Sequence, residues 1–328
     1  MTNAVNIAQT GTISSSWRNR IINGDFTIAQ RATSATVASG TAVPTVSTGY
    51  PCVDRWFVYS TGANVTAAQV AGSGTVQNRL QITGAASVTA VGVGQRIETN
   101  NSYDLNGKIC TLSVDLANSV LTTVTWTASY ANTSNTFGTI GTPTKTQIAT
   151  GTFTVNSTVA NYTTQITIPS AAVTGIEILF TVGAQTSGTW TIGNVQFEAG
   201  SAASPFEYLS YSTELALCQR YFEKSFNLET APVQNVGALQ GALVTGAYTT
   251  SASAVLATAC FAVEKRVAPT ITTYNPFAAG SGWSRSGAAD LAAGIYGAGT
   301  RAISIRVEGT PTLNANMSIH WTASAELA

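Results

Sequence analysis

Residues 123–130 alternate between apolar and hydroxyl side chains. The apolar positions are Val124, Trp126, Ala128 and Tyr130, and threonine occupies positions 123, 125 and 127. Successive residues of a β-strand point to opposite faces, so this period of two predicts an antiparallel strand with one face buried. Residues 176–182 repeat the alternation. Several short runs of this kind, separated by turn sequences such as Asn106-Gly107, predict an all-β sandwich or jelly roll.

The chain carries unusually little charge. Charged residues make up 9% of its 328 residues, against about 25% in typical soluble domains. Fifteen basic and fifteen acidic side chains give a formal net charge of zero. Nucleic acids and anionic membranes are bound through clustered lysine and arginine, so the even, sparse charge excludes both as partners. A hydrophobic content of 44% argues against disorder.

Length and the N-terminus set further limits. A chain of 328 residues is long for one hydrophobic core, so we expect two domains. The sequence contains no apolar run of the ~20 residues that a membrane-spanning helix needs. Residues 1–6 have neither the basic start nor the apolar stretch of a signal peptide. These features predict a protein made and assembled in a cytoplasm.

Several different short motifs follow one another along the chain. They are Asn23-Gly24-Asp25-Phe26, Asp54-Arg55-Trp56-Phe57, residues 193–200 (GNVQFEAG), residues 204–208 (SPFEY), residues 214–222 (ELALCQRYF) and residues 318–327 (SIHWTASAEL). The first two groups and residues 193–200 are expected to form the opening and closing strands of one antiparallel sandwich. Residues 214–222 are expected to form a hinge into a second β module.

This combination resembles the tail-fibre and head-fibre virion proteins of tailed bacteriophages that contain a carbohydrate-binding-module-like jelly roll. The resemblance covers about residues 19–224, and the C-terminal module more loosely. It implies an all-β protein with an N-terminal attachment arm (1–20), an antiparallel jelly-roll sandwich (21–200), a linker with a short helix (201–222) and a C-terminal antiparallel β-sandwich module (223–328). It also implies a homotrimer.

Local patterns add detail to this organisation. In residues 189–197 the apolar side chains occupy even positions before Gly193 and odd positions after it, which predicts a β-bulge at Gly193. Ser212 is the expected N-cap of the short helix. Trp56, Trp126 and Trp190 are expected in the core. Cys52, Cys110, Cys218 and Cys260 lack the spacing of a zinc or redox motif, so we expect free buried thiols.

Candidate catalytic groups are few. His320 is the one histidine, and its place in an apparent strand predicts a structural role. Asp25, Asp54, Asp104 and Asp115 could supply the paired acids of a glycosidase, but their turn-like settings favour hydrogen bonding to the backbone. We expect no enzymatic activity and no cofactor.

The resemblance also implies a structural calcium between the first and last strands of the jelly roll. The matching positions are Asp25 and Asn194, and they are weak calcium candidates because Asn194 is neutral where the family has an acidic residue.

Recognition residues are sought among aromatic and cationic side chains on loops. Trp283 and Arg285 lie in a stretch rich in glycine and serine, without the alternation that would bury them. Tyr296 follows in the same Gly/Ala-rich region, and Tyr274 ends the strand introduced by Pro269. These four residues, Trp283, Arg285, Tyr296 and Tyr274, are the candidate carbohydrate- or receptor-binding residues.

Three functions remain open from the sequence. The first is a non-enzymatic trimeric fibre or spike of a phage virion, assembled in the host bacterial cytoplasm, which binds other virion subunits through its arm and contacts host-surface glycans. The alternatives are a capsid-mounted decoration fibre with a purely architectural role and a stand-alone lectin-like module. A polysaccharide depolymerase is disfavoured, since no paired carboxylate motif is present.

Overall fold

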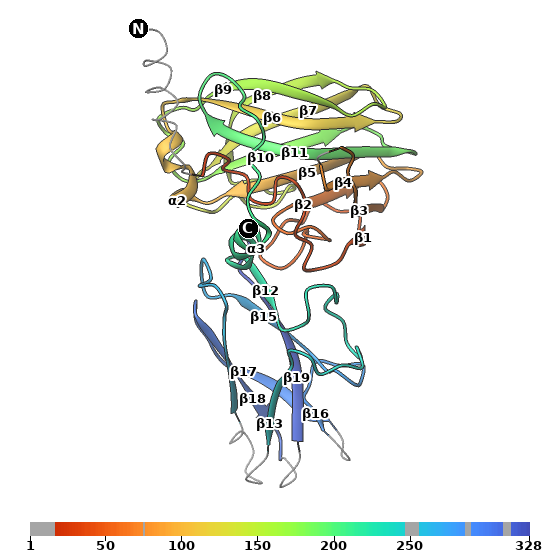
Figure 1. Ribbon diagram of the computed structural model, residues 1–328, viewed down its shortest axis with the longest axis vertical. Coiled ribbons are helices and arrows are strands. Elements are labelled where there is room, and N and C mark those ends of the chain that lie inside the picture. Colours follow the sequence, from red (N-terminus) through yellow and green to blue (C-terminus); the bar gives the residue numbers. More distant parts are fainter. Residues whose placement is uncertain (1–16, 75, 247–255, 286–289, 311–315) are drawn as a thin grey trace.

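The protein is built almost entirely of β-strands. The computed structural model describes residues 17–74, 76–246, 256–285, 290–310 and 316–328. Strands account for 46% and helices for 5% of the structure, which confirms the all-β prediction. Figure 1 shows a large sandwich above a smaller C-terminal module, with a short helix between them. No helix within the described ranges is long and apolar enough to cross a membrane.

The larger unit is a two-sheet antiparallel sandwich. Its six-stranded sheet has the order β1 (Ser34–Val37), β3 (Val65–Ala71), β4 (Asn78–Thr83), β11 (Thr189–Ala199), β6 (Ile109–Asn118) and β9 (Ala160–Thr167). Its five-stranded sheet has the order β2 (Phe57–Thr61), β5 (Ala90–Ile97), β10 (Ile176–Val182), β7 (Thr123–Ala131) and β8 (Lys145–Thr154). A short helix, α2 (Thr99–Ser102), and a 3₁₀ turn (Tyr103–Leu105) precede β6. Most consecutive strands of this sandwich lie in different sheets, so the chain crosses repeatedly between the two sheets, among other places at β4–β5, β5–β6 and β6–β7, as in a jelly roll.

The predicted alternation accounts for the core of this sandwich. In β7 the side chains of Val124, Trp126 and Ala128 are buried between the sheets, while Thr123 is exposed on the outer face. Trp56 and Trp190 are also buried, so the expected core placement of all three tryptophans is confirmed. Strand β11 changes register with β6 between Gly193 and Gln196, which confirms the predicted bulge.

The opening segment lies against the closing strand β11. The Val195 N–H donates to the Gly24 carbonyl at 2.9 Å, and the Arg20 N–H donates to the Phe197 carbonyl at 2.9 Å. A Cβ atom at Gly24 would lie 2.2 Å from the Val195 oxygen, so the approach requires glycine. The adjacency is as expected, but residues 21–25 form turns rather than a strand. Residues 1–16 of the expected attachment arm lie outside the described residues.

Helix α3 (Tyr211–Gln219) connects the two modules. Its N-cap is Ser210, whose hydroxyl accepts a hydrogen bond from the Thr213 N–H, so the expected cap at Ser212 is wrong. The cap must lie just outside the helical backbone, and Ser212 is already inside the first turn. From this helix the buried Glu214 carboxylate accepts a hydrogen bond from the Asn23 N–H of the opening segment.

We expect this contact to make stability depend on pH. Burial raises the pKa of Glu214 to about 7. The folded chain therefore binds more protons than the unfolded chain between about pH 4.5 and 7, and stability falls as pH rises through that range. Urea titrations at pH 5 and pH 8 should differ by on the order of 1–3 kcal/mol from this group.

The variant Glu214→Gln isolates that contribution, because its side chain cannot ionise. Burial also raises the pKa of Asp54 to about 6, which acts in the same direction, and lowers the pKa of His320, which acts in the opposite direction. Both groups remain in the variant. Its stability should therefore vary less between pH 8 and pH 5 than that of the wild type. Parallel stability profiles for the two proteins would contradict the assignment.

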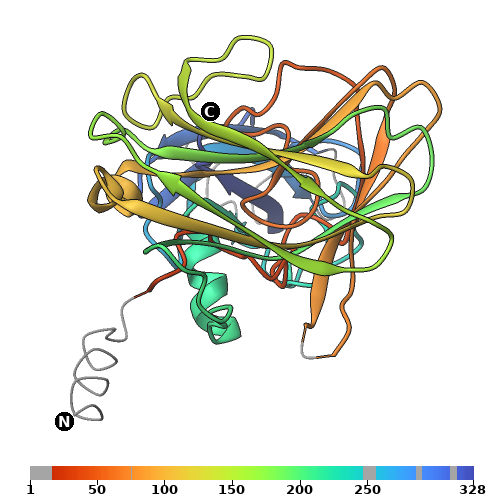
Figure 2. The ribbon, with the colours of Figure 1, turned by 90° about the horizontal axis from the view of Figure 1, so that it is seen from above.

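The C-terminal module is a second antiparallel sandwich. Its first sheet contains β12 (Phe222–Lys224), β13 (Leu243–Gly246), β15 (Thr270–Tyr274) and β16 (Ser284–Arg285), all paired with the central β19 (Asn316–Ser324). Its second sheet has the order β14 (Leu256–Cys260), β18 (Ala302–Glu308) and β17 (Ala292–Ala298). Seen from above, this module lies behind the sandwich, with α3 at the sandwich margin (Figure 2).

A buried ion network joins the two modules. Glu326, which follows β19, is fully buried and pairs with Arg55 and with Arg31, the latter at 3.1 Å. Arg31 also pairs with Asp54 at 3.2 Å. The guanidinium carbon of Arg55 lies 3.5 Å from the ring centroid of Tyr221, which follows α3. Two motifs far apart in the sequence, residues 54–57 and 318–327, therefore meet at the junction.

The cysteines are free thiols. Cys52, Cys110 and Cys218 are buried, as predicted, and Cys260 is exposed, so its expected burial is wrong. On β14 the side chains of Ala257 and Ala259 pack on the module's core, which places Cys260 on the opposite parity, facing outward.

Candidate functional site

A cavity of about 320 Å³ opens on the outer face of the C-terminal module's first sheet. We call it the distal cavity, because β13, β16 and the start of β19 lie in the part of the module away from the sandwich (Figure 1). Its lining residues are Leu239, Val244, Phe277, Ser284, Arg285, Asn316, Met317 and Ser318.

Strand parity builds the floor of the distal cavity. In β19 the side chains of Met317 and Ile319 belong to the core, so Ser318 faces outward. Ser318 pairs with Ser284 of β16 on one side and with Val244 of β13 on the other. Two serines therefore lie side by side at the centre of the floor, with an exposed valine beside them.

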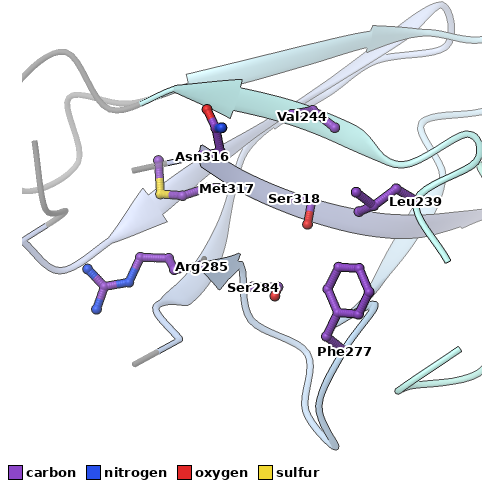
Figure 3. A pocket seen from close by; sticks show the side chains of 8 residues that line it. All are labelled: Leu239, Val244, Phe277, Ser284, Arg285, Asn316, Met317 and Ser318. Carbon is purple, nitrogen blue, oxygen red and sulfur yellow. The ribbon is translucent and has the colours of Figure 1, made fainter. Parts of the chain in front are cut away.

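Two loops supply the apolar rim. Phe277 is 50% exposed and Leu239 is 42% exposed, although both are large apolar side chains. Figure 3 shows them close to the two serines, while Arg285 and Met317 lie at the opposite end. An exposed aromatic ring beside hydroxyl groups is an arrangement suited to a ligand with both apolar and hydroxylated surface.

Hydrogen bonds hold the Phe277 loop in place. The buried Asn275 accepts bonds from the backbone N–H groups of Phe277 and Ala278, each at 2.9 Å, and donates to Asp290 at 2.7 Å. The two rim loops are also tied together, since the Gly237 N–H donates to the Pro276 carbonyl at 2.8 Å. The rim is therefore positioned before any ligand arrives.

Arg285 is the one charged residue among those lining the distal cavity in the described ranges. Its backbone N–H donates to Asp290 at 3.3 Å. In Figure 3 its guanidinium extends away from Phe277 and the two serines. The centre of the cavity is therefore neutral, which suits uncharged ligand groups, and a cation lies at one end.

Trp283 does not take part in a surface site, so its assignment as an exposed binding residue is wrong. The side chain is 0% exposed, packs in the module's core and donates through Nε1 to the Arg306 carbonyl at 3.1 Å. Trp283 immediately precedes the outward-facing Ser284, so its side chain points to the opposite face of the sheet, into the core. Strand β16 contains only two residues, and so short a strand shows no alternation in the sequence.

The structure separates the other three predicted residues. Arg285 lines the distal cavity. Tyr296 is 67% exposed on β17, in the second sheet, and does not line that cavity. Tyr274 is half-buried, packs edge-on against Phe226 with ring centroids 5.4 Å apart, and lines a different pocket at the module junction.

Sequence reasoning missed Phe277, Leu239, Val244 and the two serines. Phe277 follows Asn275-Pro276 and precedes a stretch of alanine, glycine and serine, so the criterion that selected Trp283 also fits it. Val244 carries no comparable signal, because only the pairing of β13 with β19 brings it to the serines, and Leu239 lies in the loop before β13.

His320 and the four aspartates considered for catalysis make structural contacts. His320 is buried, stacks on Phe226 with ring centroids 4.1 Å apart and contacts the Ala238 carbonyl at 3.0 Å. Each aspartate is hydrogen-bonded to a different side chain. Asp25 accepts from Thr27, Asp54 from Arg31, Asp104 from Arg20, and Asp115 from Asn161 and Asn194.

The calcium candidates lie on adjacent segments, but their side chains do not converge. Both carboxylate oxygens of Asp25 accept hydrogen bonds from Thr27, while Asn194 donates to Asp115 at 3.0 Å. In the part of the chain that the structure describes, no three His, Cys, Asp or Glu side chains are grouped so as to hold a metal ion. The donor set therefore does not fit the anionic oxygen cage that calcium prefers.

Comparison with known proteins gives partial structural likenesses. No protein-family model and no curated protein matches the sequence. The enzymatically active domain of tailspike protein 4 from bacteriophage CBA120 matches at 18% identity and a TM-score of 0.34, over 57% of this chain and 22% of that chain. A CBM4 structure matches at 15% identity and a TM-score of 0.36, over 54% of this chain and 98% of that chain. The C-terminal family 22 carbohydrate binding module of Clostridium thermocellum Xyn10B matches at 13% identity and a TM-score of 0.31, over 46% of this chain and 89% of that chain.

Proposed function

We propose that this chain is a non-enzymatic structural protein of a tailed-bacteriophage virion, a fibre or spike that contacts host-surface glycans through its distal cavity. The observation that supports the glycan contact is the distal cavity. It combines the exposed ring of Phe277, the hydroxyls of Ser284 and Ser318, and a lining in which Arg285, at one end, is the one charged residue within the described ranges. Sugars present apolar C–H faces and hydroxyl edges, and such a lining can contact both.

The virion role rests on the motif resemblance. In this role the chain forms a homotrimer, is assembled in the host bacterial cytoplasm and attaches to other virion subunits through residues 1–20. The low charge is compatible with extensive subunit contacts, because interface cores are depleted in charged residues. Light scattering of the purified protein tests the trimer, and a monomer at high concentration would contradict it.

The glycan contact is tested by titrating host-surface polysaccharide against single variants. Phe277→Ala removes the exposed ring of the rim, and we expect binding to weaken about tenfold or more, as for an aromatic anchor worth about 1.4 kcal/mol. Arg285→Ala should weaken binding less, because the guanidinium lies at one end of the cavity.

Tyr296→Ala is the matched control, since it also removes an exposed aromatic ring, but outside the distal cavity. It should bind like the wild type. Equal losses in Phe277→Ala and Tyr296→Ala would remove the distal cavity as the site. If the wild type binds none of the host-surface glycans, the architectural alternative is favoured instead.

A further inference from the structure

A second pocket, of about 200 Å³, lies between the two modules. We call it the junction pocket. The first module contributes Arg31, Ser47 and Tyr50, and the second contributes Thr272, Tyr274 and Thr322 among its lining residues. We infer that the junction pocket binds a single neutral sugar ring and that the ligand bridges the two modules. This inference does not rest on the distal cavity having any function.

The charges around the pocket select a neutral ligand. Arg31 is already paired with Asp54 at 3.2 Å and with Glu326 at 3.1 Å. Its guanidinium carbon also lies 3.8 Å from the ring centroid of Phe222, which holds the group in place. Arg31 and Arg55 balance Asp54 and Glu326, so an anion entering the pocket would meet no excess positive charge.

Hydroxyl groups dominate the polar lining. Thr272 and Ser47 line the pocket from different modules and are both exposed, and the Thr322 hydroxyl on β19 lies 3.5 Å from the Tyr274 hydroxyl. The Tyr274 ring packs edge-on against Phe226. Hydroxyls that donate and accept, beside a half-buried aromatic ring, match a ligand that itself carries several hydroxyls on an apolar ring.

The size of the pocket limits the ligand to one ring. Sites for drug-sized molecules occupy about 300–1,000 Å³, and the junction pocket is smaller. Thr322 faces the same side of β19 as Ser318 of the distal cavity, four residues away, or about 13 Å along a strand. Between them His320 is covered by Phe226 and Ala238, so the two pockets are separate openings on one strand face.

The experiment measures binding of methyl glucoside, methyl galactoside, methyl mannoside and N-acetylglucosamine to the full chain by saturation-transfer NMR and calorimetry, with glucuronate as the charged counterpart. We expect at least one neutral sugar to bind with a millimolar dissociation constant and glucuronate to bind no better. Preference for glucuronate, or no binding of any neutral sugar, would overturn the inference. In the latter case polysaccharide binding at the distal cavity remains separately measurable.

Variants locate the site. Thr272→Val, which keeps the shape and removes one hydroxyl, should weaken binding about fivefold, as expected for one lost hydrogen bond. Ser47→Trp should block the pocket. The matched controls are Thr258→Val on β14 and Ser157→Trp in an exposed turn, and both should bind like the wild type. If Phe277→Ala abolishes monosaccharide binding while Ser47→Trp leaves it intact, the sugar binds at the distal cavity and the inference is wrong.

Discussion

Glutamine in place of Glu326 is expected to lower the free energy of unfolding by about 3–5 kcal/mol, because it leaves the Arg55 guanidinium buried without its carboxylate. Arg55 is fully buried, and its remaining partners are the Arg96 carbonyl at 2.6 Å and the Tyr221 ring. These neutral groups cannot replace the lost charge. Urea denaturation of Glu326→Gln and wild type measures the difference.

The matched control for this experiment is Glu308→Gln. Glu308 pairs with Arg306 at 3.0 Å, but the two side chains are 42% and 38% exposed. An exposed pair contributes at most about 1 kcal/mol, because water solvates both partners when they separate. If both variants lose equally little stability, the network between the modules does not stabilise the fold as we describe.

The second large effect is expected at Trp283. Truncation to alanine should cost about 3–5 kcal/mol, because it opens a cavity in the core of the C-terminal module. It also leaves the Arg306 carbonyl without the indole donor. Thermal unfolding of the purified variant provides the measurement.

Tyr296→Ala serves as the comparison, since it removes a ring that is 67% exposed. Surface truncations of this kind stay within about 0.5 kcal/mol of the wild type. A Trp283→Ala protein as stable as Tyr296→Ala would contradict the buried position of Trp283 and restore it as a surface residue.

The sequence predicted those features that depend on neighbouring residues. Alternation at 123–130 placed Val124 and Trp126 in the core, and the parity change at Gly193 located the bulge in β11. Both patterns lie within one strand, and the two faces of a strand differ in burial. The all-β class follows from the same local signal repeated along the chain.

The features that escaped prediction depend on pairing between distant segments. Trp283 looked like a loop residue because β16 is too short to alternate, and its burial follows from pairing with β19. The distal cavity combines Leu239 with Ser318, and the ion network combines Arg55 with Glu326. The sequence shows Asp54-Arg55 as a motif, but it does not show that Arg55 pairs with Glu326.

The central claim is that the protein binds host-surface glycans without cleaving them. The most direct test measures binding and polymer length in one sample. The wild-type protein is incubated with host-surface polysaccharide, and size-exclusion chromatography with light scattering reports the bound protein and the length of the polysaccharide chains. We predict bound protein and chains of unchanged length. Shortened chains would contradict the central claim.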